Sequence, residues 1–315
     1  MSNGQAAPDP NEDLLRTQDF ETPNPIEVDV GSSLGTVSVE LAATTATHVE
    51  VRHDDSAGGP DWRSGLSGLL SWVSEQFADS GLRGGLGERA FGERAREPIA
   101  EAVRQTRVDL TGNRLVVRAP TTVPLRTVPL AITVRAPEDS QVGVRSAAGD
   151  VQVSGPAGRV QVQAGGGSVS VQRAGGSATA RTGSGALRLG DMAAGVQARS
   201  GSGDVEIASI GAPSSVVTGS GGVWLGAVRS DVLVRSGSGD ITIAEAEGGQ
   251  AELITGSGEL RVAVRRGVSA EVDLTSTTGS VHSDLEVSDR PPEAEPPLRI
   301  FGRSGSGDAV LSSSV

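Results

Sequence analysis

A short glycine-centred motif recurs along most of this chain of 315 residues at nearly constant spacing. In its most regular form the motif reads Ser-Gly-Asp, as at 202–204 and 238–240. From Gly149 to Gly239 the central glycines lie 18 residues apart, and the later ones follow at 19, 21 and 28 residues. A fixed period of this size is typical of a stacked-repeat fold, in which each unit buries its apolar face against its neighbours. The nine central glycines are Gly149, Gly167, Gly185, Gly203, Gly221, Gly239, Gly258, Gly279 and Gly307.

Two short runs of alternating aliphatic residues accompany each glycine. After Gly203, for example, Val205 and Ile207 stand two and four positions further on. This period of two predicts β-strands that turn one face inward. An 18-residue repeat would also fit a triangular left-handed helix with three six-residue faces, but corresponding valines such as Val142 and Val151 lie nine apart. We therefore predict an all-β fold, namely a flattened β-solenoid with two short strands per coil of about 18 residues and two parallel sheets.

The composition of the turn has a physical explanation. Glycine permits a positive φ, and it leaves room where stacked backbones approach each other closely. A column of hydroxyl residues stands three positions before the central glycines, and we expect it to satisfy backbone groups at the corner and to join coil to coil. Its members are Ser146, Thr182, Ser200, Thr218, Ser236, Thr255, Ser276 and Ser304.

An acidic residue directly follows several central glycines, as Asp204 and Asp240 do. Stacked carboxylates hold Ca²⁺ in nine-residue G-G-x-G-x-D repeats. Here, however, Ser168 and Ala186 are among the residues that interrupt the column. An arginine also stands five residues before the aspartate, as Arg199 does before Asp204. We therefore expect structural ion pairs across the corner and no calcium site.

The N-terminal third departs from the repeat. Its opening residues are polar and acidic, its middle loses the period of two, and Arg and Glu then recur at helical spacing from Glu88 to Gln105, which predicts a solvated helix. The predicted organisation is a disordered acidic segment at 1–25, first solenoid strands at 26–55, a helical insertion at 56–105 with an amphipathic helix over about 61–79, and solenoid repeats at 106–315 with a Pro-rich loop at 290–297.

Composition excludes several classes of function. The net charge of −12 and a pI near 4.8 argue against binding to nucleic acid. The absence of cysteine excludes disulfides and thiol catalysis. Neither a secretion signal nor a transmembrane segment is visible in the sequence, so we expect a cytoplasmic protein that could reach the cell surface only by a route without a signal.

No pattern of residues indicates a reaction. The three histidines, His48, His53 and His282, are scattered and lack the spacing of metal ligands. The Gly-Ser-Gly turns lead into strands and not into helices, so they are not phosphate-binding loops. We predict no catalytic residue, no cofactor and no bound metal, and hence no enzyme.

Apolar side chains at outward positions mark a candidate interaction surface. Val217, Leu233 and Ile254 stand at outward positions before successive turns, and Trp224 stands outward on the opposite face. We expect these solenoid residues to be covered by one face of the amphipathic helix, with a partner as the alternative. The helix face consists of Trp62, Leu66, Leu69, Val73 and Phe77.

The run Arg-Ser-Gly-Ser-Gly-Asp-Val-Glu-Ile at 199–207 recurs with small changes at 235–243 and 303–310. It resembles a bacterial family of β-strand-repeat domains of unknown function described as putative adhesins. The segment at 101–115 is similar to actinobacterial members of that family. The resemblance covers most of residues 26–315 and implies the repeat fold, an adhesin-like role and a link to cell-envelope or stress functions, but no catalytic residues.

These patterns favour a non-enzymatic β-solenoid scaffold that presents a long rigid face to a protein partner or for self-association. The alternative is a polysaccharide-binding or polysaccharide-active protein like the parallel β-helix lyases. Such proteins need protruding loops that carry carboxylates and basic or aromatic residues. Most turns here are minimal, and aromatic residues make up 2% of the chain.

Overall fold

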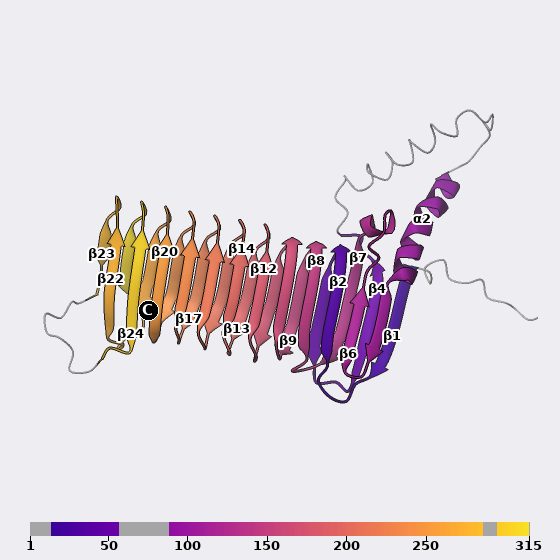
Figure 1. Ribbon diagram of the computed structural model, residues 1–315, viewed down its shortest axis with the longest axis horizontal. Coiled ribbons are helices and arrows are strands. Elements are labelled where there is room, and N and C mark those ends of the chain that lie inside the picture. The colour runs from indigo at the N-terminus through magenta and orange to yellow at the C-terminus, as the bar shows by residue number, and fades with distance from the viewer. Residues whose placement is uncertain (1–13, 57–87, 286–294, 315) are drawn as a thin grey trace, which may run out of the picture.

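The computed structural model describes residues 14–56, 88–285 and 295–314, which form a long rod of two β-sheets (Figure 1). From the N-terminal end of the rod, sheet A consists of β1 (Leu15–Glu21), β4 (Ala46–His53), β7 (Leu130–Pro137), β3 (Val37–Ala42), β9 (Val151–Ala157), β11 (Val169–Ala174), β13 (Leu187–Met192), β15 (Val205–Ile210), β17 (Val223–Val228), β19 (Ile241–Ala246), β21 (Leu260–Val264), β25 (Ala309–Ser313) and β23 (Val281–Ser283).

In the same direction, sheet B consists of β5 (Arg107–Thr111), β6 (Arg114–Arg118), β2 (Glu27–Leu34), β8 (Gln141–Ala148), β10 (Val160–Gly166), β12 (Ala178–Thr182), β14 (Val196–Ser200), β16 (Ser214–Thr218), β18 (Val232–Ser236), β20 (Gly249–Thr255), β24 (Leu298–Ser304) and β22 (Ala270–Ser276). Helix α2 (Glu88–Gln105) and the short 3-10 helix η2 (Leu125–Thr127) lie at the N-terminal end of the rod (Figure 1).

Each coil supplies one strand to each sheet, and neighbouring coils pair in parallel with a regular register. Val169 of β11 lies opposite Leu187 of β13, which lies opposite Val205 of β15. These three side chains are buried in the core, whereas the alternate residues face solvent. The flattened β-solenoid with two strands per coil is therefore confirmed. The described residues form eleven coils, which at about 4.8 Å per strand spacing make a rod about 50 Å long.

The central glycines stack at one corner, where the backbones of successive coils nearly touch. A Cβ atom on Gly185 would lie 1.6 Å from the carbonyl oxygen of Gly167, and one on Gly203 would lie 2.0 Å from that of Gly185. Positive φ, which the glycine pattern also predicts, occurs only at Gly149 and Gly167 among the nine. The close approach of backbones, and not φ, therefore excludes side chains from most of these positions.

The hydroxyl column next to these glycines joins the coils, as predicted. Thr182 accepts a hydrogen bond at 3.2 Å from the N–H of Gly185 in its own coil and donates one at 3.4 Å to the carbonyl of Gly167 in the preceding coil. The same two bonds recur at Thr218, Ser236, Thr255, Ser276 and Ser304. Within the described residues, the hydroxyls of Ser146 and Ser200 have no hydrogen-bond partner.

The last coil of the sequence is not the last coil of the rod. Strands β24 and β25 lie between the β20–β21 coil and the β22–β23 coil, so the latter forms the C-terminal end (Figure 1). Gly302 in β24 leaves a space in the core that the side chain of Leu274 fills, because a Cβ atom there would lie 2.4 Å from Leu274 Cδ2. Most of the Pro-rich loop predicted at 290–297 lies outside the described residues.

The N-terminal end is closed by antiparallel strands. The β2–β3 coil lies between the β6–β7 coil and the β8–β9 coil. Strands β1 and β4 then add antiparallel to sheet A, and β5 adds antiparallel to sheet B. The predicted disorder at 1–25 is wrong for Leu15–Glu21, because this segment pairs with β4 along its whole length. Strand β4, within the predicted solenoid segment 26–55, belongs to this cap and not to a coil.

Helix α2 covers the same end of the stack. Ala102 and Val103 are buried, and Arg16 of β1 donates a hydrogen bond at 3.0 Å to the carbonyl of Arg104. The prediction of a solvated helix is therefore wrong for the last turns of α2, which pack against the cap strands. The amphipathic helix predicted over 61–79 lies outside the described residues.

Candidate interaction surfaces

The surface residues singled out from the sequence fall into three groups. The first, which is the predicted helix face of Trp62, Leu66, Leu69, Val73 and Phe77, lies outside the described residues. The second is on the outer face of sheet B, and the third is Trp224 on the outer face of sheet A. The predicted covering of the second and third groups by the first stays a prediction.

On sheet B, the predicted residues lie on neighbouring strands but do not form a continuous stripe. Val217 and Ile254 share a register position with Arg235 between them, whereas Leu233 lies two residues earlier in its strand, beside Glu252. Arg235 and Glu252 form an ion pair at 3.7 Å. Because this charged pair separates the half-buried apolar side chains, sheet B offers no extended apolar surface here.

Sequence reasoning missed Phe301, which extends this group. It lies on β24 directly opposite Glu252, two strands from Leu233. Its place on this face depends on the intercalation of the last coil, which the local sequence pattern does not show. The alternation of Leu298 and Ile300 with Phe301 was the available signal that its side chain faces outward.

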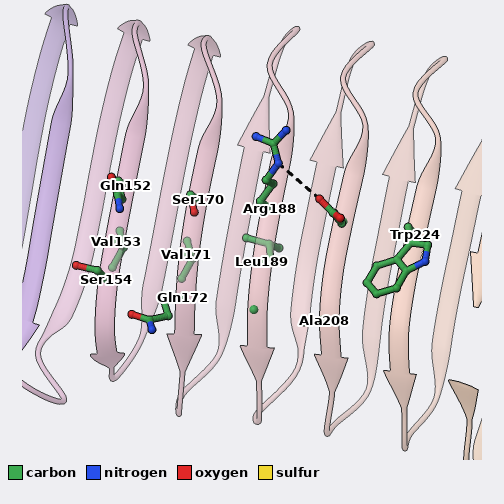
Figure 2. A pocket seen from close by; sticks show the side chains of 12 residues that line it. Gln152, Val153, Ser154, Ser170, Val171, Gln172, Arg188, Leu189, Ala208 and Trp224 are labelled. Atoms are coloured by element: carbon green, nitrogen blue, oxygen red, sulfur yellow. Dashed lines mark ion pairs between the residues drawn. The ribbon is translucent and has the colours of Figure 1, made fainter. Parts of the chain in front are cut away.

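On sheet A, Trp224 lies at one end of a shallow hollow of about 480 Å³ (Figure 2). Its side chain is 42% exposed. The indole lies over Gly226, where a Cβ atom would be 3.2 Å from Trp224 Cη2. The polar side chains that line the hollow are Gln152, Ser154, Ser170, Gln172, Arg188 and Glu206.

The floor of the hollow is low because small residues occupy the next outward row. Gly190 on β13 and Ala208 on β15 stand beside Gly226 on β17 in this row, two residues after Arg188, Glu206 and Trp224. The outward position of Trp224 follows from the strand alternation, as predicted. The hollow beside it depends on side-chain sizes in neighbouring coils.

Among the described residues, no element covers the C-terminal end of the rod. Val281 of β23 is 50% exposed, although Leu260, at the same register position two strands away, is fully buried. No residue of β22 or β23 is buried, and neither strand has a neighbour on its outer side among the described residues. Two open strand edges and the end of the apolar core therefore lie together at this end.

The predicted ion pairs at the corner are wrong. Within the described residues, Arg199 has no acidic partner and Arg235 pairs with Glu252. Asp204 instead accepts a hydrogen bond at 2.8 Å from the backbone N–H of Gly222 in the next coil. Asp150, Asp240 and Asp308 make the equivalent bond to the backbone N–H of Ser168, Glu259 and Ser280. The carboxylate bonds to the backbone amide and not to the arginine, because stacking places the amide directly beside it. An exposed arginine can remain in water.

Metal-binding geometry is absent from the described part of the chain. No group of three His, Asp or Glu side chains there could hold an ion. The histidines each pair with one carboxylate, His48 with Asp19 at 2.6 Å and His282 with Asp284 at 2.8 Å. His53 pairs with Asp55.

A charged cluster around Asp29 of β2 was also missed from the sequence. Its carboxylate is buried and accepts hydrogen bonds from Arg114 at 2.9 Å and from Arg118 at 2.6 Å, while Arg145 lies at 3.7 Å. Burial raises the pKa of Asp29, but the hydrogen bonds from Arg118 and Arg114 outweigh it and hold the pKa below its usual value. The cluster ties β2 to β6 and β8, which only the intercalation of the first coil brings together.

A parallel two-sheet arrangement with minimal turns defines the chain as a β-solenoid repeat protein. The Toastrack DUF4097 family matches residues 123–310, more than half of the chain, and the chain therefore belongs to this family. The predicted resemblance is confirmed at the level of the family, and the actinobacterial type stays a prediction. Among curated proteins, no sequence matches the chain.

Several solved structures are similar to this chain. A putative adhesin from Bacteroides fragilis has 11% identity and a TM-score of 0.47, covering 94% of this chain and 96% of that chain. A putative lipid binding protein from Parabacteroides distasonis has 12% identity and a TM-score of 0.35, with the same coverage. A putative cell adhesion protein from Clostridium sporogenes has 8% identity and a TM-score of 0.21, covering 95% and 99%.

Helix α2, the one α-helix in the described ranges, is not long and apolar enough to cross a membrane.

Proposed function

We propose that this chain is a non-enzymatic interaction scaffold whose uncovered C-terminal end joins a second copy of the chain. The observation that carries the proposal is the difference between the two ends of the rod. Antiparallel strands and α2 cover the N-terminal end, whereas in the part of the chain that the structure describes β22 and β23 have open outer edges over a partly exposed core.

A second copy matches this end because it presents the same two features. A twofold axis across the end would set β22 beside its own copy and β23 beside its own copy, in each case antiparallel. Such an arrangement continues both sheets and covers Val281 and Val272 together, and an interface of this kind is self-complementary. Open strand edges favour such pairing because their backbone groups otherwise bond only to water.

The size of the end predicts that the association is weak. The contact is two strands wide, well below the roughly 800 Å² per partner of a standard interface. Glu271 of β22 is paired with Arg299 at 3.3 Å, but Asp273 on the same strand has no ion pair among the described residues, so its charge opposes the approach of a second copy. We therefore expect a dimer that forms only at high protein concentration.

Sedimentation velocity over a range of concentrations tests this proposal. The wild-type chain should shift from a monomer to an elongated dimer, and Val281→Asp should abolish the shift because it places a charge in the contact. Val123→Asp is the matched control, since Val123 is a 77% exposed valine elsewhere on the molecule. A wild-type chain that stays monomeric at millimolar concentration would overturn the proposal, and so would a dimer unaffected by Val281→Asp.

The proposal includes no reaction. In the described ranges, no group of three or more His, Asp or Glu side chains could hold a metal ion. The matched Toastrack family is one of unknown function, so family membership supports the repeat fold and assigns no reaction.

A further inference from the structure

We propose that the hollow beside Trp224 binds a neutral carbohydrate chain lying along the rod. This inference goes beyond the association of the C-terminal ends and concerns a different face of the molecule. It rests on the exposed indole, the polar side chains that surround the hollow, and the charge balance of the site.

The indole is presented as a flat platform. Figure 2 shows the ring of Trp224 nearly face-on in a view that also shows the sheet face-on, so the ring lies roughly parallel to the sheet. One ring face covers Gly226, and the other is open to solvent. The phenylalanines Phe20 and Phe301, by comparison, are half-buried. A flat apolar surface of this kind stacks well against a ligand that has an apolar face, and the indole N–H adds a hydrogen-bond donor.

The remaining groups of the hollow suit a ligand rich in hydroxyls. Gln152, Ser170, Arg188, Glu206 and Trp224 form one outward row across five neighbouring strands, about 19 Å from end to end. This row runs along the rod, so a linear ligand would meet one side chain at each strand. Amide, hydroxyl, carboxylate and guanidinium groups together offer both donors and acceptors.

One amide of the hollow is already held in place. The Oε1 atom of Gln172 accepts a hydrogen bond at 2.8 Å from the backbone N–H of Gly155. This bond fixes the carboxamide while its Nε2 has no hydrogen-bond partner among the described residues, so the group can serve as a positioned donor. Fixing a donor before binding reduces the entropy lost when the ligand binds.

The charge of the site favours a neutral ligand. Arg188 and Glu206, the charged residues that line the hollow, are 3.5 Å apart and neutralise each other. With a net charge of −12 on the whole chain, a polyanion such as nucleic acid or an acidic polysaccharide would be repelled. A peptide that adds as a strand is also disfavoured here, because the strands under the hollow are paired on both sides and have no free edge.

A glycan microarray with neutral and acidic oligosaccharides, probed with the full-length chain, tests the proposal. The strongest neutral ligand is then titrated by calorimetry against three variants. Trp224→Thr should weaken binding by about tenfold or more, because stacking is lost. Threonine suits this position since Thr242 occupies it in the next coil. Ala208→Leu should also weaken binding, because it fills the floor of the hollow while Trp224 remains.

Leu233→Thr is the matched control, since it removes an outward apolar side chain on the opposite sheet, and it should change affinity by less than about twofold. Thermal unfolding of each variant shows that the fold is kept. The proposal is overturned if no neutral glycan binds, if only acidic glycans bind, or if Trp224→Thr and Ala208→Leu bind as tightly as the wild type. None of these outcomes depends on whether the chain forms dimers.

Discussion

The carboxylate of Asp204 accepts a hydrogen bond at 2.8 Å from the backbone N–H of Gly222, the residue one coil further along the rod. The same bond recurs at Asp150, Asp240 and Asp308. The acidic column therefore fastens each coil to the next at its corner, beside the hydroxyl column. From the sequence, such an aspartate could form an ion pair or bind calcium. In the structure its carboxylate instead accepts a hydrogen bond from the backbone of the neighbouring coil.

This bond predicts a difference between two substitutions of Asp204. Asparagine retains the acceptor oxygen, so Asp204→Asn should leave thermal stability nearly unchanged. Asp204→Ala removes the acceptor and should destabilise the fold by about 1 kcal/mol, which is about 1.5 °C in melting temperature for a chain of this size. If Asn destabilised as much as Ala, the charge of Asp204 would matter and the predicted ion pair would regain support.

Calcium provides a further check on the same column. Millimolar Ca²⁺ should leave the melting temperature of the wild type unchanged, because a ligand stabilises the folded state only if it binds. A rise that Asp204→Asn combined with Asp240→Asn abolished would show that the column binds calcium after all.

The corner glycines predict a second pair of contrasting variants. A Cβ atom on Gly203 would lie 2.0 Å from the carbonyl oxygen of Gly185, so Gly203→Ala should force the coils apart and destabilise by about 1–3 kcal/mol. Gly222→Ala is the control in the neighbouring coil, because the nearest atom to its Cβ would be Asp204 Oδ1 at 3.7 Å. Thermal unfolding should show little change in Gly222→Ala. Equal effects of the two substitutions would contradict the crowding explanation.

The Asp29 cluster predicts a dependence of stability on pH. The pKa of Asp29 is lower in the folded state than in the unfolded chain, where it is about 3.9. Its stabilising contribution is therefore present above pH 4 and is lost as the pH falls through the folded-state pKa. Asp29→Asn should lower the free energy of unfolding by about 1–2 kcal/mol at pH 7, and the difference from wild type should shrink as the pH falls below the pKa of the unfolded chain.

Urea unfolding at a series of pH values measures this difference. Asp273→Asn is the control, because Asp273 is exposed on β22 and has no ion pair among the described residues. A gap between Asp29→Asn and wild type that stayed constant down to pH 2 would mean that the ionised carboxylate does not stabilise the fold.

The internal coils could be predicted because their structure repeats. Val205 and Ile207 face inward for the same reason as their equivalents in every neighbouring coil, so alternation and period together define strands, register and core. The outward position of Trp224 followed from the same alternation. The close approach of the glycine backbones was also implied, although positive φ proved to be a property of few of them.

The ends of the rod could not be predicted, because the repeat pattern does not specify which free edge a coil will join. The glycine-centred corner around Gly307 can stack on the corner of the β20–β21 coil and also on the corner of the β22–β23 coil, because both have the same pattern. The exposure of Val281 follows from that choice, since its strand resembles the internal ones in sequence. The partners of Asp29 likewise depend on where the first coil inserts.

The intercalated order of the last coils predicts a specific cross-link. Thr275 of β22 lies directly opposite Arg303 of β24, and both side chains are exposed on the outer face of sheet B. Adjacent strands are about 4.8 Å apart, which suits a disulfide, and the chain has no cysteine of its own. Thr275→Cys with Arg303→Cys should therefore form an intramolecular disulfide under mild oxidation, seen by mass spectrometry of peptides from the digested chain.

Ile254→Cys with Thr275→Cys is the control, because β24 separates these positions, whereas stacking in sequence order would make them neighbours. A disulfide in the control pair and none in the first pair would show that the coils stack in the order of the sequence.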